Sequence, residues 1–282
     1  MKTVRLGKDG PLISEIGIGT WAWGDRLFWN YGSGYGKEDL SEAFKLSVAG
    51  GVTFFDSAEV YGAGRSERIL GQFTRGNDKL IIASKFFPYP WRLSGRILVR
   101  ALKKSLARMG RSQIDLYQMH WPSPPLSIES WMQAMADAHE AGLIRHIGVS
   151  NYSAEQMEQA HRVLERRGLA LSSNQILYSL LERGPEINGL MQLSKDLGVS
   201  IIAYSPLGQG LLTGKYSPDK QPRGVRGLRF TKGGIAHALE IVALLKAIGE
   251  SNGGKSPAQV AINWTIRKGT IPIPGVKNRR QT

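Results

Sequence analysis

The sequence contains no cysteine among its 282 residues. This absence excludes disulfide bonds, thiolate catalysis and metal sites built on cysteine. No apolar run approaches the roughly 20 residues that a membrane-spanning helix requires. The first residues also lack the apolar stretch of a secretory signal. We therefore expect a cytoplasmic protein that does not bind membranes.

Acidic residues are scarce, with 23 Asp and Glu against 37 Lys and Arg, which gives a net charge of +14. Such an excess can indicate a nucleic-acid partner. The cations are scattered, however, and form only short clusters at residues 103–104, 166–167 and 279–280. No basic stripe interleaved with aromatic residues occurs. We therefore expect no nucleic-acid partner, although a positive field would attract a phosphorylated cofactor.

Short β-branched or apolar runs alternate along the chain with longer segments of helical periodicity. After a hairpin over residues 3–15, the predicted strands are residues 16–20, 53–56, 80–85, 114–120, 146–150, 171–176, 200–204 and 270–274. The predicted helices are residues 37–49, 65–73, 94–109, 128–141, 154–167, 186–197 and 257–267, with an extra helix over 235–251. This alternation predicts parallel strands and crossover helices. Eight such strands favour an α/β fold, a (β/α)8 TIM barrel that forms one domain over residues 1–282.

The eighth helix of such a barrel has no counterpart in the sequence. The sequence ends at Thr282, a few residues after the last predicted strand. A barrel normally follows each strand with a helix. We therefore expect a barrel that lacks helix 8 and the tail that would follow it.

Four reactive side chains follow successive predicted strands. Asp56, Lys85 and His120 end the second, third and fourth strands, and Tyr61 lies just past Asp56. Active sites of these barrels lie at the carboxyl ends of the strands, so we expect the four side chains to share one cleft. A lysine after the apolar run 81–84 needs a partner, because an unpaired buried ammonium is unfavourable. Asp56 is the obvious partner, and a salt bridge without chemistry is the alternative reading.

The same side chains suit the reduction of a carbonyl group. A free phenol has a pKa of about 10, and a nearby ammonium group lowers it. Lys85 would therefore make Tyr61 a better acid, Asp56 would hold Lys85 charged, and His120 would hydrogen-bond the same substrate oxygen. None of these residues can supply a hydride, so a redox cofactor is required. The five histidines show no metal-ligand spacing, and we expect no metal site.

Six ordered segments resemble the aldo-keto reductase superfamily, and the resemblance extends over essentially the whole chain. The segments are residues 17–21 (GIGTW), 55–62 (FDSAEVYG), 83–85 (ASK), 115–122 (DLYQMHWP), 148–152 (GVSNY) and 203–208 (AYSPLG). The resemblance implies that Asp56, Tyr61, Lys85 and His120 form the catalytic tetrad, with Tyr61 as general acid/base. It also implies the reduction of aldehydes or ketones by hydride transfer from NADPH. Some relatives of this fold are NADPH-sensing channel subunits, so a binding protein with little turnover is the alternative.

The resemblance further implies where NADPH binds. Ser150, Asn151 and Gln175 would bind the carboxamide, Tyr204 would stack on the nicotinamide ring, and cations of residues 274–281 would favour NADPH over NADH. The implied cofactor-binding residues are Gly19, Thr20, Trp21, Ser150, Asn151, Gln175, Tyr204, Ser205, Pro206, Leu207, Gly208, Leu211, Lys215, Lys277, Asn278 and Gln281. We expect a monomer whose partner is a small-molecule aldehyde or ketone.

Overall fold

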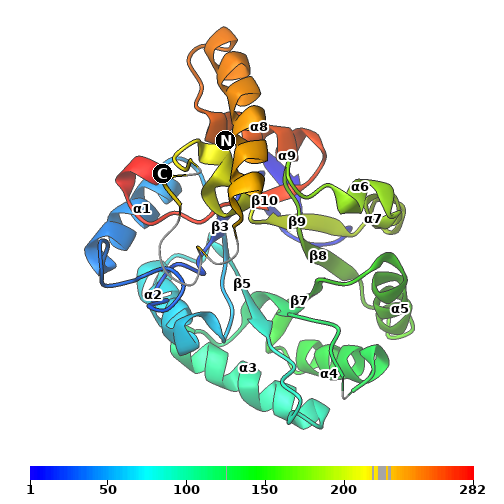
Figure 1. The fold of residues 1–282 in the computed structure, drawn as a ribbon. Helices are drawn as coiled ribbons and strands as arrows, with labels where there is room; N and C mark the ends of the chain where they lie inside the picture. The colour runs from blue at the N-terminus through cyan, green and yellow to red at the C-terminus, as the bar shows by residue number, and fades with distance from the viewer. Residues whose placement is uncertain (125, 218, 222–226, 228–229) are drawn as a thin grey trace.

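The main feature of the computed structural model, which describes residues 1–124, 126–217, 219–221, 227 and 230–282, is a barrel of eight parallel strands (Figure 1). The strands are β3 (Ile18–Gly19), β4 (Phe54–Asp56), β5 (Ile81–Phe86), β6 (Ile114–Met119), β7 (Ile144–Ser150), β8 (Leu171–Leu177), β9 (Ser200–Tyr204) and β10 (Ile271–Ile273). They neighbour one another in chain order from β3 to β10. Backbone hydrogen bonds from Gly17 to Pro272 (2.9 Å) and from Gly19 to Pro274 (3.1 Å) then join the first strand to the last.

Helices surround the barrel, as the alternating pattern predicts. They are α1 (Lys37–Ala49), α2 (Arg65–Thr74), α3 (Gly95–Met109), α4 (Ile128–Glu140), α5 (Ala154–Glu165), α6 (Gly184–Ile187), α7 (Leu190–Leu197), α8 (Lys232–Ser251) and α9 (Pro257–Arg267). Local sequence explains where several begin. Ser153 and Ser256, for example, form capping boxes with Gln156 and Gln259. The predicted (β/α)8 barrel is confirmed.

Several element boundaries differ from the prediction. The helix predicted over 186–197 is divided into α6 and α7, because Gly189 adopts a left-handed backbone with φ 79°. The extra helix α8 begins earlier than predicted, where the side chain of Thr231 accepts a hydrogen bond from the Gly234 amide (3.0 Å). After β10, the described chain contains only the short 3-10 helix η4 (Arg279–Gln281).

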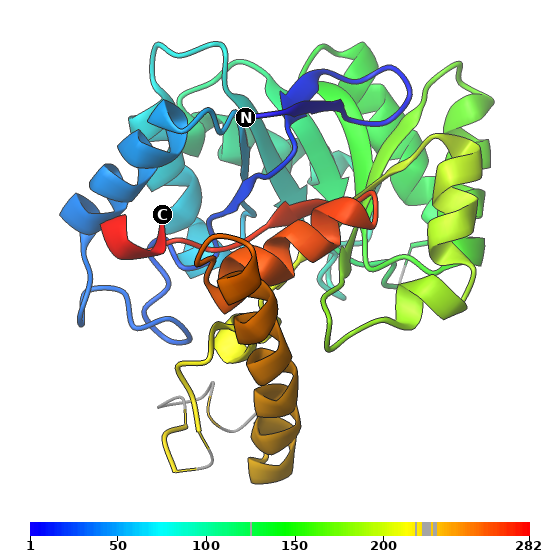
Figure 2. The ribbon, with the colours of Figure 1, turned by 90° about the horizontal axis from the view of Figure 1, so that it is seen from above.

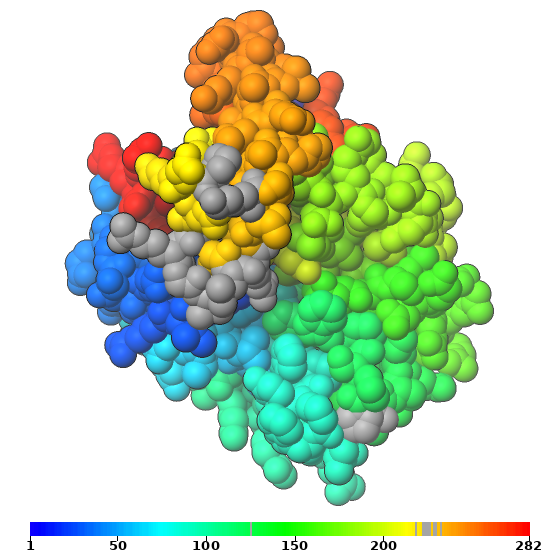
Figure 3. Space-filling model, viewed as in Figure 1, coloured from blue at the N-terminus to red at the C-terminus, as the bar shows by residue number. Residues whose placement is uncertain are grey.

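Helix α8 projects beyond the rounded outline of the barrel, as the space-filling view shows (Figure 3). It packs against the 3-10 helix η2 (Gly208–Thr213) and against α9. No helix in the described ranges is long and apolar enough to cross a membrane.

The N-terminal hairpin covers one end of the barrel. Its strands, β1 (Thr3–Arg5) and β2 (Leu12–Ser14), pair antiparallel, and Figure 2 shows them at the end opposite to α8. Leu6 and Ile13 are fully buried in one apolar cluster with barrel residues that include Phe54 and Leu116. The barrel interior below the strand ends is therefore a packed core and not a pore.

Replacing Ile13 with Ala tests whether the hairpin contributes to this core. The change should lower the free energy of unfolding by about 2–5 kcal/mol, because it leaves a cavity among buried side chains. Leu12→Ala is the matched control on the same strand, since Leu12 is 59% exposed, and it should change stability by no more than about 0.5 kcal/mol. Equal losses in urea unfolding of the two variants would contradict the burial of Ile13 in this core.

Candidate active site

Lys85 and Asp56 form a buried ion pair at the carboxyl ends of β4 and β5. Lys85 is fully buried, and its Nζ donates to Asp56 Oδ1, to the Ser57 carbonyl oxygen (2.8 Å) and to Tyr61 Oη (3.3 Å). The ammonium group therefore connects the carboxylate to the phenol. These contacts join three of the four side chains that the sequence indicated, and the fourth, His120, lies against the Tyr61 ring.

The charge on Lys85 is maintained by its partners. Burial lowers the pKa of this ammonium group, but Asp56 and Tyr61 outweigh burial and raise the pKa above its ordinary value. Lys85 therefore stays protonated at neutral pH. The buried carboxylate of Asp56 has an ionic partner in the same place, as a stable buried charge requires.

Tyr61 is positioned by a strained turn directly after it. Gly62, Ala63 and Gly64 all have left-handed backbones, with φ values of 55°, 54° and 82°. A Cβ atom on Gly62 would lie only 2.6 Å from the Gly24 carbonyl oxygen. Such strain in a non-glycine residue is unfavourable and is concentrated at functional sites. The turn places the Tyr61 ring at the edge of the His120 ring, with centroids 5.9 Å apart.

The pKa of the half-buried Tyr61 differs from the sequence-based expectation. Burial, the largest influence, raises the pKa above 10, Lys85 lowers it, and Asp56 raises it. Lys85 thus acts in the expected direction, but the expected net lowering is wrong because burial outweighs it. The phenol consequently keeps its proton at neutral pH.

His120 is neutral at this site. Burial and the Lys85 ammonium lower the pKa of its imidazole to about 3. Its Nδ1 is buried and has no hydrogen-bond partner within the described ranges. The ring also contacts Phe87, with centroids 5.4 Å apart. A neutral imidazole carries one N–H group, which can donate a hydrogen bond to a substrate oxygen.

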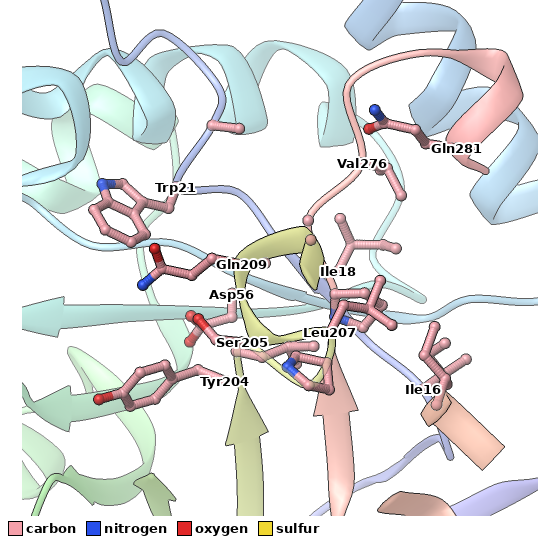
Figure 4. A pocket seen from close by; sticks show the side chains of 18 of the residues that line it. Ile16, Ile18, Trp21, Asp56, Tyr204, Ser205, Leu207, Gln209, Val276 and Gln281 are labelled. Atoms are coloured by element: carbon pink, nitrogen blue, oxygen red, sulfur yellow. The ribbon is translucent and has the colours of Figure 1, made fainter. Parts of the chain in front are cut away.

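A cavity of about 1430 Å³ connects this site with the C-terminal segment of the chain. Asp56, Tyr61 and His120 line it, whereas the buried Lys85 lies behind its wall. Figure 4 shows lining side chains that come both from the segment after β9 and from the C-terminal segment. The implied cofactor residues that line the cavity are Gly19, Trp21, Ser150, Asn151, Gln175, Tyr204, Ser205, Pro206, Leu207, Lys215, Lys277, Asn278 and Gln281.

Three implied cofactor residues, Thr20, Gly208 and Leu211, do not line this cavity. Thr20 is fully buried, and its hydroxyl donates to the Asp56 carbonyl oxygen at 2.9 Å. Leu211 packs in an apolar cluster with Ile235 of α8. Thr20 and Leu211 therefore support the surrounding structure in this conformation of the chain.

Strained backbone occurs on the cavity wall itself. Asn151, Ser205 and Gln209 have positive φ values of 62°, 52° and 53°, although none is glycine. Tyr204 donates a hydrogen bond from its hydroxyl to Asn151 Oδ1 at 2.9 Å. Left-handed residues of this kind are typical of ligand-binding segments.

The C-terminal segment contacts the aromatic loop that follows β3. Lys277 Nζ lies 4.5 Å from the ring centroid of Trp29 and 4.9 Å from that of Tyr35. Gln281 Oε1 accepts a hydrogen bond from the Lys277 amide at 3.0 Å. The far end of the cavity thus has a cationic side chain held against aromatic rings.

The sequence reasoning missed Gln118. This fully buried side chain of β6 donates to Asp56 Oδ2 at 2.8 Å. Gln175 Nε2 donates to the same oxygen at 2.9 Å. The available signal was strand alternation, which places Gln118 on the same face of its strand as His120. No group of acidic or histidine side chains in the described ranges is arranged to hold a metal ion.

Comparison with known proteins agrees with this geometry. Residues 15–282 match the Aldo/keto reductase family, and the chain belongs to that family of oxidoreductases. It is 41% identical to "Pyridoxal reductase, chloroplastic" from Arabidopsis thaliana, over 97% of this chain and 78% of the relative. It is 34% identical to "Aldo-keto reductase yakc [NADP(+)]" from Schizosaccharomyces pombe, over 98% and 83%. Its fold resembles glycerol dehydrogenase AKR11B4 from Gluconobacter oxydans, with TM-score 0.83, 26% identity and coverage of 99% and 87%.

The lowered pKa of His120 predicts a pH-dependent stability. A histidine in the unfolded chain has a pKa of about 6.5, whereas that of folded His120 is about 3. The unfolded state therefore binds more protons below pH 6.5, and the free energy of unfolding should fall as the pH drops. The expected loss is up to about 1.4 kcal/mol per pH unit.

His120→Asn should remove this part of the acid sensitivity when urea unfolding is compared at about pH 7 and about pH 5. His237→Asn is the control, because solvent reaches that side chain, which is 69% exposed, in the folded chain. If wild type and His120→Asn lose the same stability between these two pH values, His120 is not a source of the acid sensitivity.

Proposed function

We propose that this chain is an NADPH-dependent oxidoreductase that reduces an aldehyde or ketone to an alcohol. The observation that carries the proposal is the position of Lys85 Nζ, which contacts both Asp56 and Tyr61 Oη behind the wall of the cavity. An ion pair with only a structural role would not require a phenol hydroxyl between it and the cavity. Membership of the aldo/keto reductase family supports the same reaction class.

Each of the four side chains has a distinct part in the proposed reaction. Tyr61 is protonated at neutral pH, because burial raises its pKa, and it gives this proton to the carbonyl oxygen. The Lys85 ammonium then stabilises the phenolate that is left. Asp56 holds Lys85 in place, and the neutral His120 donates a hydrogen bond that orients the same oxygen. NADPH, when bound, supplies the hydride.

The residues of the cavity suit a long, charged cofactor. The cavity runs from Asp56 to Lys277 and Gln281 and is also lined by the left-handed residues Asn151 and Ser205. We propose that Asn151 and Tyr204 bind the nicotinamide end and that Lys277 binds the 2′-phosphate. The relative named for NADP(+) supports this preference.

Pyridoxal is the first substrate we propose to test. The Arabidopsis thaliana relative, 41% identical to this chain, is named for its reduction. Trp21, Phe87 and Trp121 line the same cavity as Tyr61, and aromatic walls suit a planar aldehyde. A cytoplasmic location and a monomeric state stay predictions from the sequence.

Tyr61→Phe tests the proposed mechanism. The variant should reduce pyridoxal or simple aldehydes at least about 100-fold more slowly than wild type, because it lacks the transferable proton. Its NADPH affinity, measured by fluorescence titration, should stay unchanged. Tyr152→Phe is the matched control, since it removes a buried hydroxyl that has no hydrogen-bond partner in the described ranges.

A Tyr61→Phe protein with wild-type turnover would disprove the mechanism. Tight NADPH binding by the wild type without turnover of any aldehyde or ketone would instead favour a sensor.

Lys277→Met tests the preference for NADPH. Loss of the cation should weaken NADPH binding about 10-fold and leave NADH binding nearly unchanged, because only NADPH carries the 2′-phosphate. Arg279→Met is the matched control, since Arg279 pairs with Glu42 at 3.2 Å, and it should change neither affinity. A similar loss for both cofactors would contradict the assigned contact.

A further inference from the structure

Gln118 is a fully buried polar side chain that has no part in the proposed reaction. It lies in β6, where its backbone is in register with Lys85 of β5 and with Gly148 of β7. Below this level the barrel interior is apolar, with Leu116 in the core cluster. A buried amide is unfavourable unless its donors and acceptor find partners, so its partners explain why it is there.

Both ends of the Gln118 amide are engaged. Its Nε2 donates to Asp56 Oδ2 at 2.8 Å, and its Oε1 accepts from Gln175 Nε2 at 3.2 Å. Gln175 Nε2 also reaches Asp56 Oδ2 at 2.9 Å. The three side chains come from β4, β6 and β8 and form a closed triangle. Asp56 belongs both to this triangle and to the ion pair, and Gln175 belongs both to the triangle and to the lining of the cavity.

The neighbouring strand leaves space for this amide. A Cβ atom on Gly148 would lie 2.9 Å from Gln118 Cγ and 2.5 Å from Ser173 Oγ. Both distances are far shorter than an ordinary carbon contact of about 3.5–4.0 Å. Only glycine fits at position 148 while Gln118 keeps its place.

The two oxygens of the Asp56 carboxylate accept hydrogen bonds from different partners. Oδ1 accepts from Lys85, whereas Oδ2 accepts from the two amides. Without the amides, Oδ2 would be a buried carboxylate oxygen with no donor. We expect such a carboxylate to turn toward other donors, which would disturb the 3.3 Å contact between Lys85 and Tyr61.

We infer that Gln118 is a positioning residue, which holds Asp56 toward Lys85 and holds the Gln175 amide at the cavity wall. It thereby connects the ion pair beneath Tyr61 to the side of the cavity where NADPH is proposed to bind. This inference rests on the proposed reductase function for its effect on turnover. Its effect on NADPH affinity can be measured without turnover.

Gln118→Met keeps the volume of the side chain and removes both hydrogen bonds. It should lower kcat about 10-fold with little change in the KM of the carbonyl substrate, as expected for the loss of a hydrogen bond to a charged group. It should also raise the Kd for NADPH several-fold, because Gln175 loses an acceptor. Ser173→Ala is the matched control, since Ser173 Oγ has no hydrogen-bond partner in the described part of the chain.

Gln118→Glu adds a second measurement, the pH dependence of kcat, which would not change if Gln118 only filled space. A protonated carboxyl group can donate to Asp56 Oδ2 as the amide does, whereas an ionised one repels the carboxylate. Burial and the Asp56 charge raise the pKa of the new group, whereas the Lys85 ammonium on the neighbouring strand lowers it. We expect burial to outweigh Lys85, as it does at Tyr61, so the kcat of the variant relative to wild type should fall as pH rises from about 6 to about 9. Circular dichroism of both variants checks that they fold.

The outcomes separate this inference from the proposed function. If wild type reduces carbonyls and Gln118→Met matches it in kcat and in NADPH affinity, the inference is overturned. A constant ratio of kcat values for Gln118→Glu across this pH range overturns it as well. If wild type has no turnover, the proposed function fails, and the inference is then decided by NADPH affinity alone: an unchanged Kd in Gln118→Met overturns it, and a raised Kd supports it.

Discussion

The ion pair between Lys85 and Asp56 is the interaction on which the candidate site depends. Two opposite charges lie inside a barrel whose lower interior is apolar. Neither charge would be stable there alone, because the loss of hydration is large and only the partner offsets it. Ser57, Gln118 and Gln175 supply further hydrogen bonds to the two charged groups. The pair therefore requires polar groups from several strands at one level of the barrel.

The reacting groups around this ion pair are held by segments whose backbone conformations are themselves unfavourable. The turn after Tyr61 contains three successive left-handed residues, and the cavity wall contains three more at separate positions that are not glycine. Such conformations persist only where the rest of the structure maintains them. The closed sheet, the packed hairpin and the contact of Lys277 with the aromatic loop provide that rigid surrounding.

Much of the fold could be predicted because its signals are local. Alternating apolar runs and helical periods indicated the eight strands, and Ser153 and Ser256 indicated helix starts. The division between α6 and α7 was missed although Asn188 and Gly189 form a typical turn sequence. Gln118 was missed for a different reason: strand alternation places it on the same face as His120, but its partners lie on β4 and β8, far from it in the chain.

The sequence by itself determined the barrel and brought Asp56, Lys85 and His120 to successive strand ends, because parallel strands in a barrel all end at the same side. It also indicated that Lys85 needs an anionic partner. The tertiary structure alone decided the direction in which the pKa of Tyr61 is shifted, because burial raises this pKa more than Lys85 lowers it. It also decided which amides reach Asp56. These outcomes depend on distances and solvent exclusion between strands far apart in the chain, which no local pattern encodes.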